Sequence, residues 1–193
     1  MSRTPIANDA DTGTPLSTDF VNYNQLSDGT ERKVTISNLK LTKTPKTIQI
    51  NSGGKIGTTA GWDITGDNGY IADLPAGQTA STLIIPVVGL VDGDEITAYS
   101  IRGVVTSAGN TVTVDSDLIK LQANSNGTQT ETTIGSTSQV SETSTDRFGQ
   151  EDSSITGTNT VSNYISYYII VTATTAASTT VNLNSVTVTV NGS

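Results

Sequence analysis

The chain has 193 residues, a formal net charge of −8, and neither cysteine nor histidine. The acidity disfavours nucleic-acid binding, because Lys and Arg are needed to displace phosphate counterions, and it disfavours anionic membrane surfaces. Without Cys and His the chain lacks disulfides, thiolate nucleophiles, the commonest metal ligands and the usual general base near neutral pH. We therefore expect a protein that is not an enzyme and that uses no cofactor.

The composition favours β-structure. Hydrophobic residues make up 34% and charged residues 15% of the chain, and Thr, Ser, Asn and Gly take much of the remainder. Thr is β-branched and stiff at χ1, so a Thr-rich surface favours extended strands over helices. No apolar run reaches the 18 residues of a membrane span, and residues 1–7 lack the apolar core of a secretory signal. We expect no membrane insertion.

The first part of the chain, residues 1–45, is predicted to be an extended arm. It is polar, and a short helix near residues 18–26 would place three apolar side chains at a spacing of three on one face. An Asp-Gly turn follows at residues 28–29, and a brief strand is expected over residues 34–36.

The second part, residues 46–193, is predicted to be a jelly-roll-like antiparallel β-sandwich. Its apolar residues alternate with Thr and Ser over short runs that are separated by turn signals, and no helical period is sustained. The all-β class follows from this pattern. The expected strands cover residues 82–88, 95–105, 111–115, 117–121, 129–134, 139–145, 164–174 and 179–190.

Local sequence patterns in the second part predict a hairpin turn, a long loop and a β-bulge. An Ala-Gly-Asn sequence at residues 108–110 indicates a hairpin turn, and the Gly/Ser/Thr-rich residues 146–160 indicate a long loop. In the last strand, Val181 and Leu183 lie on one parity and the later valines on the other, which predicts a bulge at residues 184–185.

Clustered acidic residues raise the question of a Ca²⁺ site, but their spacing does not favour one. Asp92, Asp94 and Glu95 could supply oxygen ligands to Ca²⁺ from a turn, and Asp63, Asp67 and Asp73 could contribute in the same way. The spacing of an EF-hand is missing. We favour a solvated turn without metal.

Paired carboxylates could hydrolyse glycosides without histidine. Asp115, Asp117 and Glu142 are the candidates, but no local pattern indicates that two of them converge. A glycosidase or esterase is therefore disfavoured.

Three aromatic residues could contact a sugar ring or a second subunit. Tyr164 and Tyr168 lie on one face of the expected strand over residues 164–174, and Trp62 is the only tryptophan. Aromatic faces suit the apolar faces of sugars, but they bury equally well in a core or an interface. We favour burial and keep glycan contact as the alternative.

Residues 19–39, which include the sequence DGTERKVTISNL at residues 28–39, resemble an N-terminal segment of tailed-bacteriophage fibre and spike proteins. There an apolar strand, a DGT turn and an ending of the form (R/K)-(V/I)-T-(I/L)-x-(N/D)-L precede the fibre body. The remainder looks like the β-sandwich modules of phage fibres and capsid decoration proteins. The resemblance implies docking through Phe20, Tyr23, Leu26, Arg32, Val34, Ile36 and Leu39.

Two hypotheses follow from these observations. In the first, the chain is a virion structural protein, such as a capsid decoration protein, a head fibre or a short tail or neck fibre. Its arm docks to capsid, portal or tail, and the protein forms a homo-oligomer, expected to be a trimer. In the alternative, the sandwich is a carbohydrate-binding or receptor-binding module that recognises a glycan on a host surface.

Overall fold

The structure, a computed structural model, describes residues 20–24, 31–35, 45–50, 61–64, 72–157 and 159–192. The chain divides into two compact units, Met1–Thr42 and Lys43–Ser193. The described residues form strands, turns and loops. Among them no helix is long and apolar enough to cross a membrane.

The first unit contains a pair of antiparallel strands, β1 (Phe20–Asn24) and β2 (Glu31–Thr35). Tyr23 lies opposite Arg32 in this pair. The predicted helix near residues 18–26 is therefore wrong over β1. The reason is that pairing with β2 satisfies backbone groups that an isolated helical turn would leave open, and the aromatic and β-branched residues of β1 favour a strand. The predicted turn at residues 28–29 lies outside the described residues.

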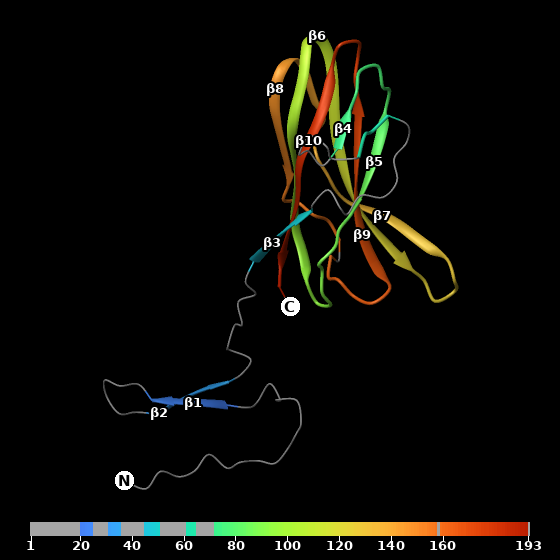
Figure 1. Cartoon of the computed structure of the whole chain (residues 1–193). Coiled ribbons are helices and arrows are strands. Elements are labelled where there is room, and N and C mark those ends of the chain that lie inside the picture. Colours follow the sequence, from blue (N-terminus) through green and yellow to red (C-terminus); the bar gives the residue numbers. More distant parts are fainter. Residues whose placement is uncertain are drawn as a thin grey trace. The chain divides into compact units, whose positions relative to one another are not determined.

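The second unit is the predicted all-β, jelly-roll-like antiparallel sandwich (Figure 1). Its strands are joined mostly by short connections. They are β3 (Pro45–Ile50), β4 (Ala72–Leu74), β5 (Ser81–Pro86), β6 (Glu95–Ala123), β7 (Gln129–Ser136), β8 (Val140–Asp152), β9 (Ile165–Thr174) and β10 (Thr180–Asn191).

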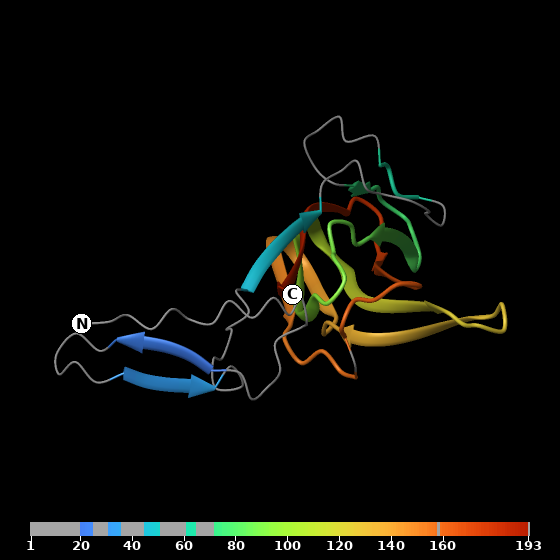
Figure 2. The ribbon, with the colours of Figure 1, turned by 90° about the horizontal axis from the view of Figure 1, so that it is seen from below.

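One strand, β6, takes part in both layers of the sandwich. Its first half, over residues 95–106, pairs with β10, and its second half, over residues 113–122, pairs with β9. One layer therefore contains β3, β10, the first half of β6 and β8, with β4 also paired to β10. The other contains β5, β9 and the second half of β6. Figure 2 shows β7 and the end of β6 projecting as a two-stranded ribbon.

The predicted hairpin at residues 108–110 is wrong. Gly109 does adopt a positive φ of 95°, but the chain passes from one layer to the other instead of folding back on itself. β8 follows β6 through this bend, from the pair Tyr99 and Asp152 to the pair Val114 and Val140, with two register shifts. A glycine-containing turn sequence such as this one predicts that the chain changes direction. Whether the chain then forms a hairpin or a bent strand depends on which strand pairs with it.

The predicted loop over residues 146–160 is also partly wrong, because β8 extends to Asp152. The predicted bulge in β10 is confirmed by a register shift between Leu183 and Ser185. Because of this shift, the apolar residues before and after the bulge, which would otherwise point to opposite faces, all point into the same core. Val181, Leu183, Val186, Val188 and Val190 are all fully buried.

A buried polar network lies between the two layers. The Tyr99 hydroxyl donates to the Ser116 carbonyl at 2.8 Å, and the Ser116 N–H donates to Thr137 Oγ1 at 3.0 Å. Thr137 Oγ1 in turn donates to Gln150 Oε1 at 3.3 Å. Burial raises the pKa of Tyr99 to about 12. The network joins both halves of β6 to β8, which helps to hold β8 in place.

Candidate functional site

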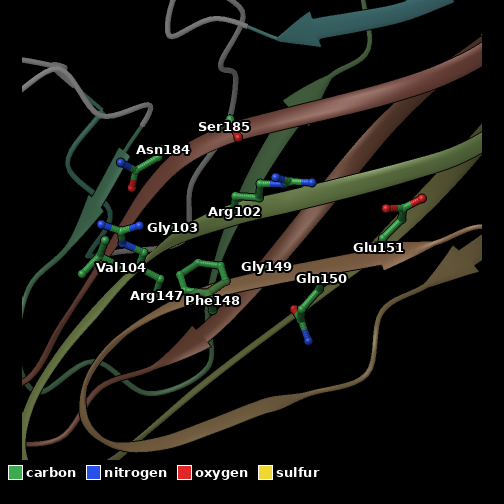
Figure 3. A pocket seen from close by; sticks show the side chains of 10 residues that line it. All are labelled: Arg102, Gly103, Val104, Arg147, Phe148, Gly149, Gln150, Glu151, Asn184 and Ser185. Atoms are coloured by element: carbon green, nitrogen blue, oxygen red, sulfur yellow. The ribbon is translucent and has the colours of Figure 1, made fainter.

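A groove lies on the outer face of the layer formed by β10, β6 and β8, and it has a volume of about 790 Å³ (Figure 3). It is built from residues within these three strands, so its walls rest on paired backbone. Its lining residues, hereafter the groove residues, are Arg102, Gly103, Val104, Arg147, Phe148, Gly149, Gln150, Glu151, Asn184 and Ser185.

Strand register explains why these side chains come together. Arg102 lies opposite Ser185 on β10 and opposite Gly149 on β8, while Val104 lies opposite Arg147. Alternate residues of a strand point to opposite faces, so a strand that sends Ile101 and Val105 into the core must send Arg102 and Val104 outward. The same alternation faces Arg147, Gly149 and Glu151 outward on β8.

Two glycines give the groove its depth. A Cβ on Gly103 would collide with the Asn182 carbonyl and would lie 2.6 Å from the ring of Phe148, so only glycine lets this buried ring pack closely beneath the groove. A Cβ on Gly149 would meet nothing nearer than Arg102 Cγ at 3.8 Å. Gly149 therefore leaves open space between Arg102 and Arg147.

The bulge in β10 adds a polar side chain at the edge. Asn184 is the extra residue between the register pairs of Leu183 and Ser185, and its side chain is exposed. Bulges commonly redirect a side chain next to a binding site. Figure 3 shows Asn184 and Ser185 on β10, across the groove from Gln150 and Glu151 on β8.

The charge of the groove contrasts with that of the domain. Over residues 72–192 the sequence has eleven acidic residues and three cationic ones, Arg102, Lys120 and Arg147. Two of the three cations therefore lie in the groove. Neither guanidinium forms an ion pair within the described residues, whereas Lys46 Nζ lies 2.8 Å from Asp94 Oδ2.

A second, smaller hollow of about 340 Å³ continues the groove toward the sheet edge at β3. It shares Arg102, Glu151 and Ser185 with the groove. Together the two hollows form a polar strip across β3, β10, β6 and β8. The additional lining residues are Thr47, Gln49, Ala98, Tyr99, Ser100, Thr187 and Thr189.

The three predicted aromatic contacts lie elsewhere. Trp62 is buried, with 6% of its surface exposed, and its Nε1 donates to the Ser81 carbonyl at 3.1 Å, so its ring is in the core. Tyr168 is half-buried opposite Ile119, and burial, followed by the Glu131 carboxylate, raises its pKa. None of the three belongs to the groove residues.

Tyr164 is different, because 81% of its surface is exposed and its φ of 70° is unusual for a residue other than glycine. The Ala123 N–H donates to its carbonyl at 2.9 Å, which anchors its backbone beside the end of β6. Its ring thus remains accessible to a ligand or a partner.

Of the predicted docking residues, Phe20, Tyr23, Arg32 and Val34 lie in β1 and β2. Their backbone pairing is described. Leu26, Ile36 and Leu39 lie outside the described residues.

The candidate calcium ligands do not converge. Asp94 is fully buried, where its Oδ2 accepts from Lys46 Nζ and from the Val91 N–H at 3.1 Å. It is therefore not the solvated residue that the turn predicted. Among the described residues, no three Asp or Glu side chains are placed to share a metal ion. Asp67 lies outside them.

The candidate catalytic carboxylates are held by separate partners. Asp115 accepts from Gln139 Nε2 at 3.2 Å, and Asp117 accepts from Ser136 Oγ at 2.6 Å. Glu142 lies opposite Val112. Because alternate residues of a strand point to opposite faces, Glu142 and Asp115 lie on different faces of the sheet.

Sequence reasoning missed the groove residues. Arg102 lies on the outward parity of a correctly predicted strand, but Arg147 was assigned to a loop, so nothing brought the two together. The available signal was the scarcity of cations after residue 72. When cationic residues are this scarce in an acidic domain, two arginines are candidates for a binding site.

No protein-family model and no curated protein matches the chain. Among solved structures, the xylan-binding module CBM15 is similar, with a TM-score of 0.45 and 11% identity over 77% of this chain and 99% of that one. The C-terminal carbohydrate-binding module CBM6 of the laminarinase LamC from Zobellia galactanivorans has a TM-score of 0.41 and 13% identity over 74% and 98%. A structure of infectious bursal disease virus has a TM-score of 0.38 and 12% identity over 89% and 38%. By its own strand order and pairing, the second unit is an antiparallel β-sandwich of the jelly-roll type.

Proposed function

We propose that the second unit is a carbohydrate-binding module that holds a glycan in the groove without converting it. The observation that carries the proposal is the groove itself, an open hollow on the outer face of a rigid sheet, lined by two arginines that form no ion pair with any residue the structure describes. Sites built on strands hold their side chains more precisely than sites on loops.

The chemistry of the groove residues suits a sugar. Asn184 and Ser185 can donate and accept hydrogen bonds, while Arg102 and Glu151 add strong donors and an acceptor. Sugar hydroxyls need both kinds of partner at close spacing. Because the second hollow continues the groove, the strip suits an extended chain more than a single ring.

The lining favours binding over hydrolysis. Glycoside hydrolysis needs two carboxyl groups that flank the scissile bond. Glu151 is the one carboxylate that lines the groove or its extension. With no histidine in the chain, no second general acid or base of ordinary kind is at hand.

A glycan array probed with the full chain tests this function. The variant Gly149→Leu should fill the groove and abolish binding, since the new side chain enters open space and leaves every hydrogen-bonding group in place. Thr132→Leu, which adds a similar side chain at an exposed position of β7, is the matched control and should bind normally. Equal loss in both variants, or no binding by the native chain, would contradict the proposal.

A further variant tests the exposed aromatic. Tyr164→Ala should leave binding unchanged, because Tyr164 does not line the groove. If Tyr164→Ala abolishes binding while Gly149→Leu does not, the glycan site lies at the end of β6 instead.

For the first unit we propose docking to a virion, on the strength of the resemblance of residues 19–39 to phage fibre segments. A glycan-binding sandwich that projects from capsid, portal or tail through this arm would read a host surface. Deleting residues 1–40 should leave a soluble domain that no longer incorporates into particles. Normal incorporation of the truncated chain would refute the docking role, and the copy number per particle would separate decoration from a fibre.

A further inference from the structure

We propose that the groove selects acidic glycans, meaning sugars that carry carboxylate, sulfate or phosphate groups, and that Arg102 and Arg147 hold the acidic group. This inference rests on the proposed function, because it names the ligand class of the same groove. It does not follow from the fold, which is compatible with neutral and acidic ligands alike.

The placement of charge in the domain supports an acidic ligand. The eleven acidic residues over residues 72–192 give the domain a field that repels anions. Placed at random, two arginines would be expected to pair with some of these carboxylates. Both instead face the groove, and neither pairs within the described residues.

The other two acidic residues in this half of β8, Asp146 and Asp152, are directed away from the groove arginines. Asp146, the neighbour of Arg147, uses Oδ1 to accept the backbone N–H of Arg147 at 2.7 Å. Asp152 accepts the N–H groups of Ser136 and Ser154 at 2.8 and 2.7 Å. These bonds fix the acids to the backbone and leave the Arg147 guanidinium available to a ligand.

Strand register also sets the spacing of the two arginines. Arg102 lies opposite Gly149, and Arg147 is two residues before Gly149 on the same strand, so the arginines are diagonal neighbours. Diagonal neighbours on one face are roughly 7–8 Å apart at Cα, within joint reach of long side chains. Between them Gly149 leaves an opening without a side chain. Figure 3 shows the two side chains directed toward opposite ends of the groove, Arg102 toward Glu151 and Arg147 toward Asn184. An oxyanion at the opening is therefore held once these exposed side chains turn toward it, and each planar guanidinium can then make a bidentate contact.

Glu151 gives the groove a direction. It is the other diagonal neighbour of Arg102, on the side away from Arg147. An anionic group is therefore favoured near Arg147 and disfavoured near Glu151, which instead suits a hydroxyl of the adjoining sugar. Removing the charge of Glu151 should strengthen the binding of acidic ligands.

The test is an array of matched glycan pairs probed with the full chain. The pairs are sialylated and asialo glycans, oligogalacturonate and its methyl ester, and dextran sulfate and dextran. They therefore distinguish a sialic acid, a uronic acid and a sulfate ester as the acidic group. We expect the acidic member to bind more tightly in at least one pair. Arg102→Gln and Arg147→Gln should each weaken that member roughly ten-fold. Glu151→Gln should strengthen it, and Lys120→Gln, the matched control outside the groove, should change nothing.

The outcomes separate this inference from the proposed function. Equal binding of both members of every pair, abolished by Gly149→Leu, would keep the glycan groove and overturn its selectivity. Absence of all binding would refute both. Binding of single-stranded DNA as tight as that of the preferred acidic glycan would show a general polyanion patch and overturn the inference. Arg102→Lys, which keeps the charge and loses the planar fork, should give an intermediate affinity if the contact is bidentate.

Discussion

The two outer faces of the sandwich differ although one strand contributes to both. On the face formed by β3, β10, β6 and β8, the first half of β6 presents Ser100 and Arg102 beside Thr187. On the face formed by β5, β9 and β6, the second half presents Ile119 opposite Tyr168, with Ile84 opposite Ile170 nearby. The first face offers hydrogen bonds and cationic groups, whereas the second offers apolar side chains beside the carboxylates of Asp115 and Asp117.

The difference shows how a strand that crosses between layers gives one domain two kinds of surface. The outward-facing residues of β6 before the bend near Gly109 belong to one layer, and those after it belong to the other and have a different composition. A polar face suits a ligand that is rich in hydroxyls, whereas the half-buried side chains of Ile84, Tyr168 and Ile170 suit a second protein surface. The predicted trimer, which stays a prediction, would use the second face.

The largest expected effect concerns the support of the polar face. Gly103→Ala should lower the free energy of unfolding by about 2–4 kcal/mol, because the new Cβ collides with the Asn182 carbonyl and the ring of Phe148. Urea denaturation followed by circular dichroism measures this. Gly149→Ala is the matched control on the neighbouring strand, and it should stay within about 0.5 kcal/mol. Similar losses for both would mean that Gly103 is not what lets Phe148 pack.

The second prediction tests whether the apolar face joins subunits. Ile170→Glu should convert a homo-oligomer into monomers, because a charge in an apolar interface loses its hydration without a partner. Light scattering with size-exclusion chromatography gives the mass. Thr187→Glu, on the polar face, should leave the oligomer intact. An oligomer that survives Ile170→Glu would place the contact elsewhere.

A smaller effect is expected in the network that joins the layers behind the two faces. Tyr99→Phe should cost about 1 kcal/mol through loss of the hydroxyl bond to the Ser116 carbonyl. Tyr164→Phe, at an exposed tyrosine, should cost almost nothing.

The same residue gives a pH dependence. The pKa of Tyr99 is about 12 in the folded chain against an ordinary 10.0, so the protonated form is favoured by folding. Its contribution to stability is fully present below pH 10 and is lost as the pH rises from 10 to 12, where the unfolded chain ionises first. Thermal melts over this range should show a steeper decline for the native chain than for Tyr99→Phe. Parallel declines would assign the alkaline loss to other groups.

The strands and the bulge could be predicted because they depend on local alternation. Val181 and Val186 lie on opposite parities, and a bulge is the one simple way to bury both in one core. The corner at Gly109 and the extension of β8 could not be predicted in this way. A positive φ and a polar sequence are compatible with a hairpin, a loop or a bent strand, and the choice depends on pairing between residues about 40 positions apart.

The sequence by itself determined the β class, the acidic surface, the absence of Cys and His, and which residues of most strands face the core. These properties depend on composition and on a period of two, which act within a few residues. Only the tertiary structure decided that Arg102 and Arg147 are neighbours, that Trp62 is buried, and that Asp94 pairs with Lys46. Each of these depends on contacts between residues that are distant in the sequence, and these contacts are set by the packing of the whole core and not by any local pattern.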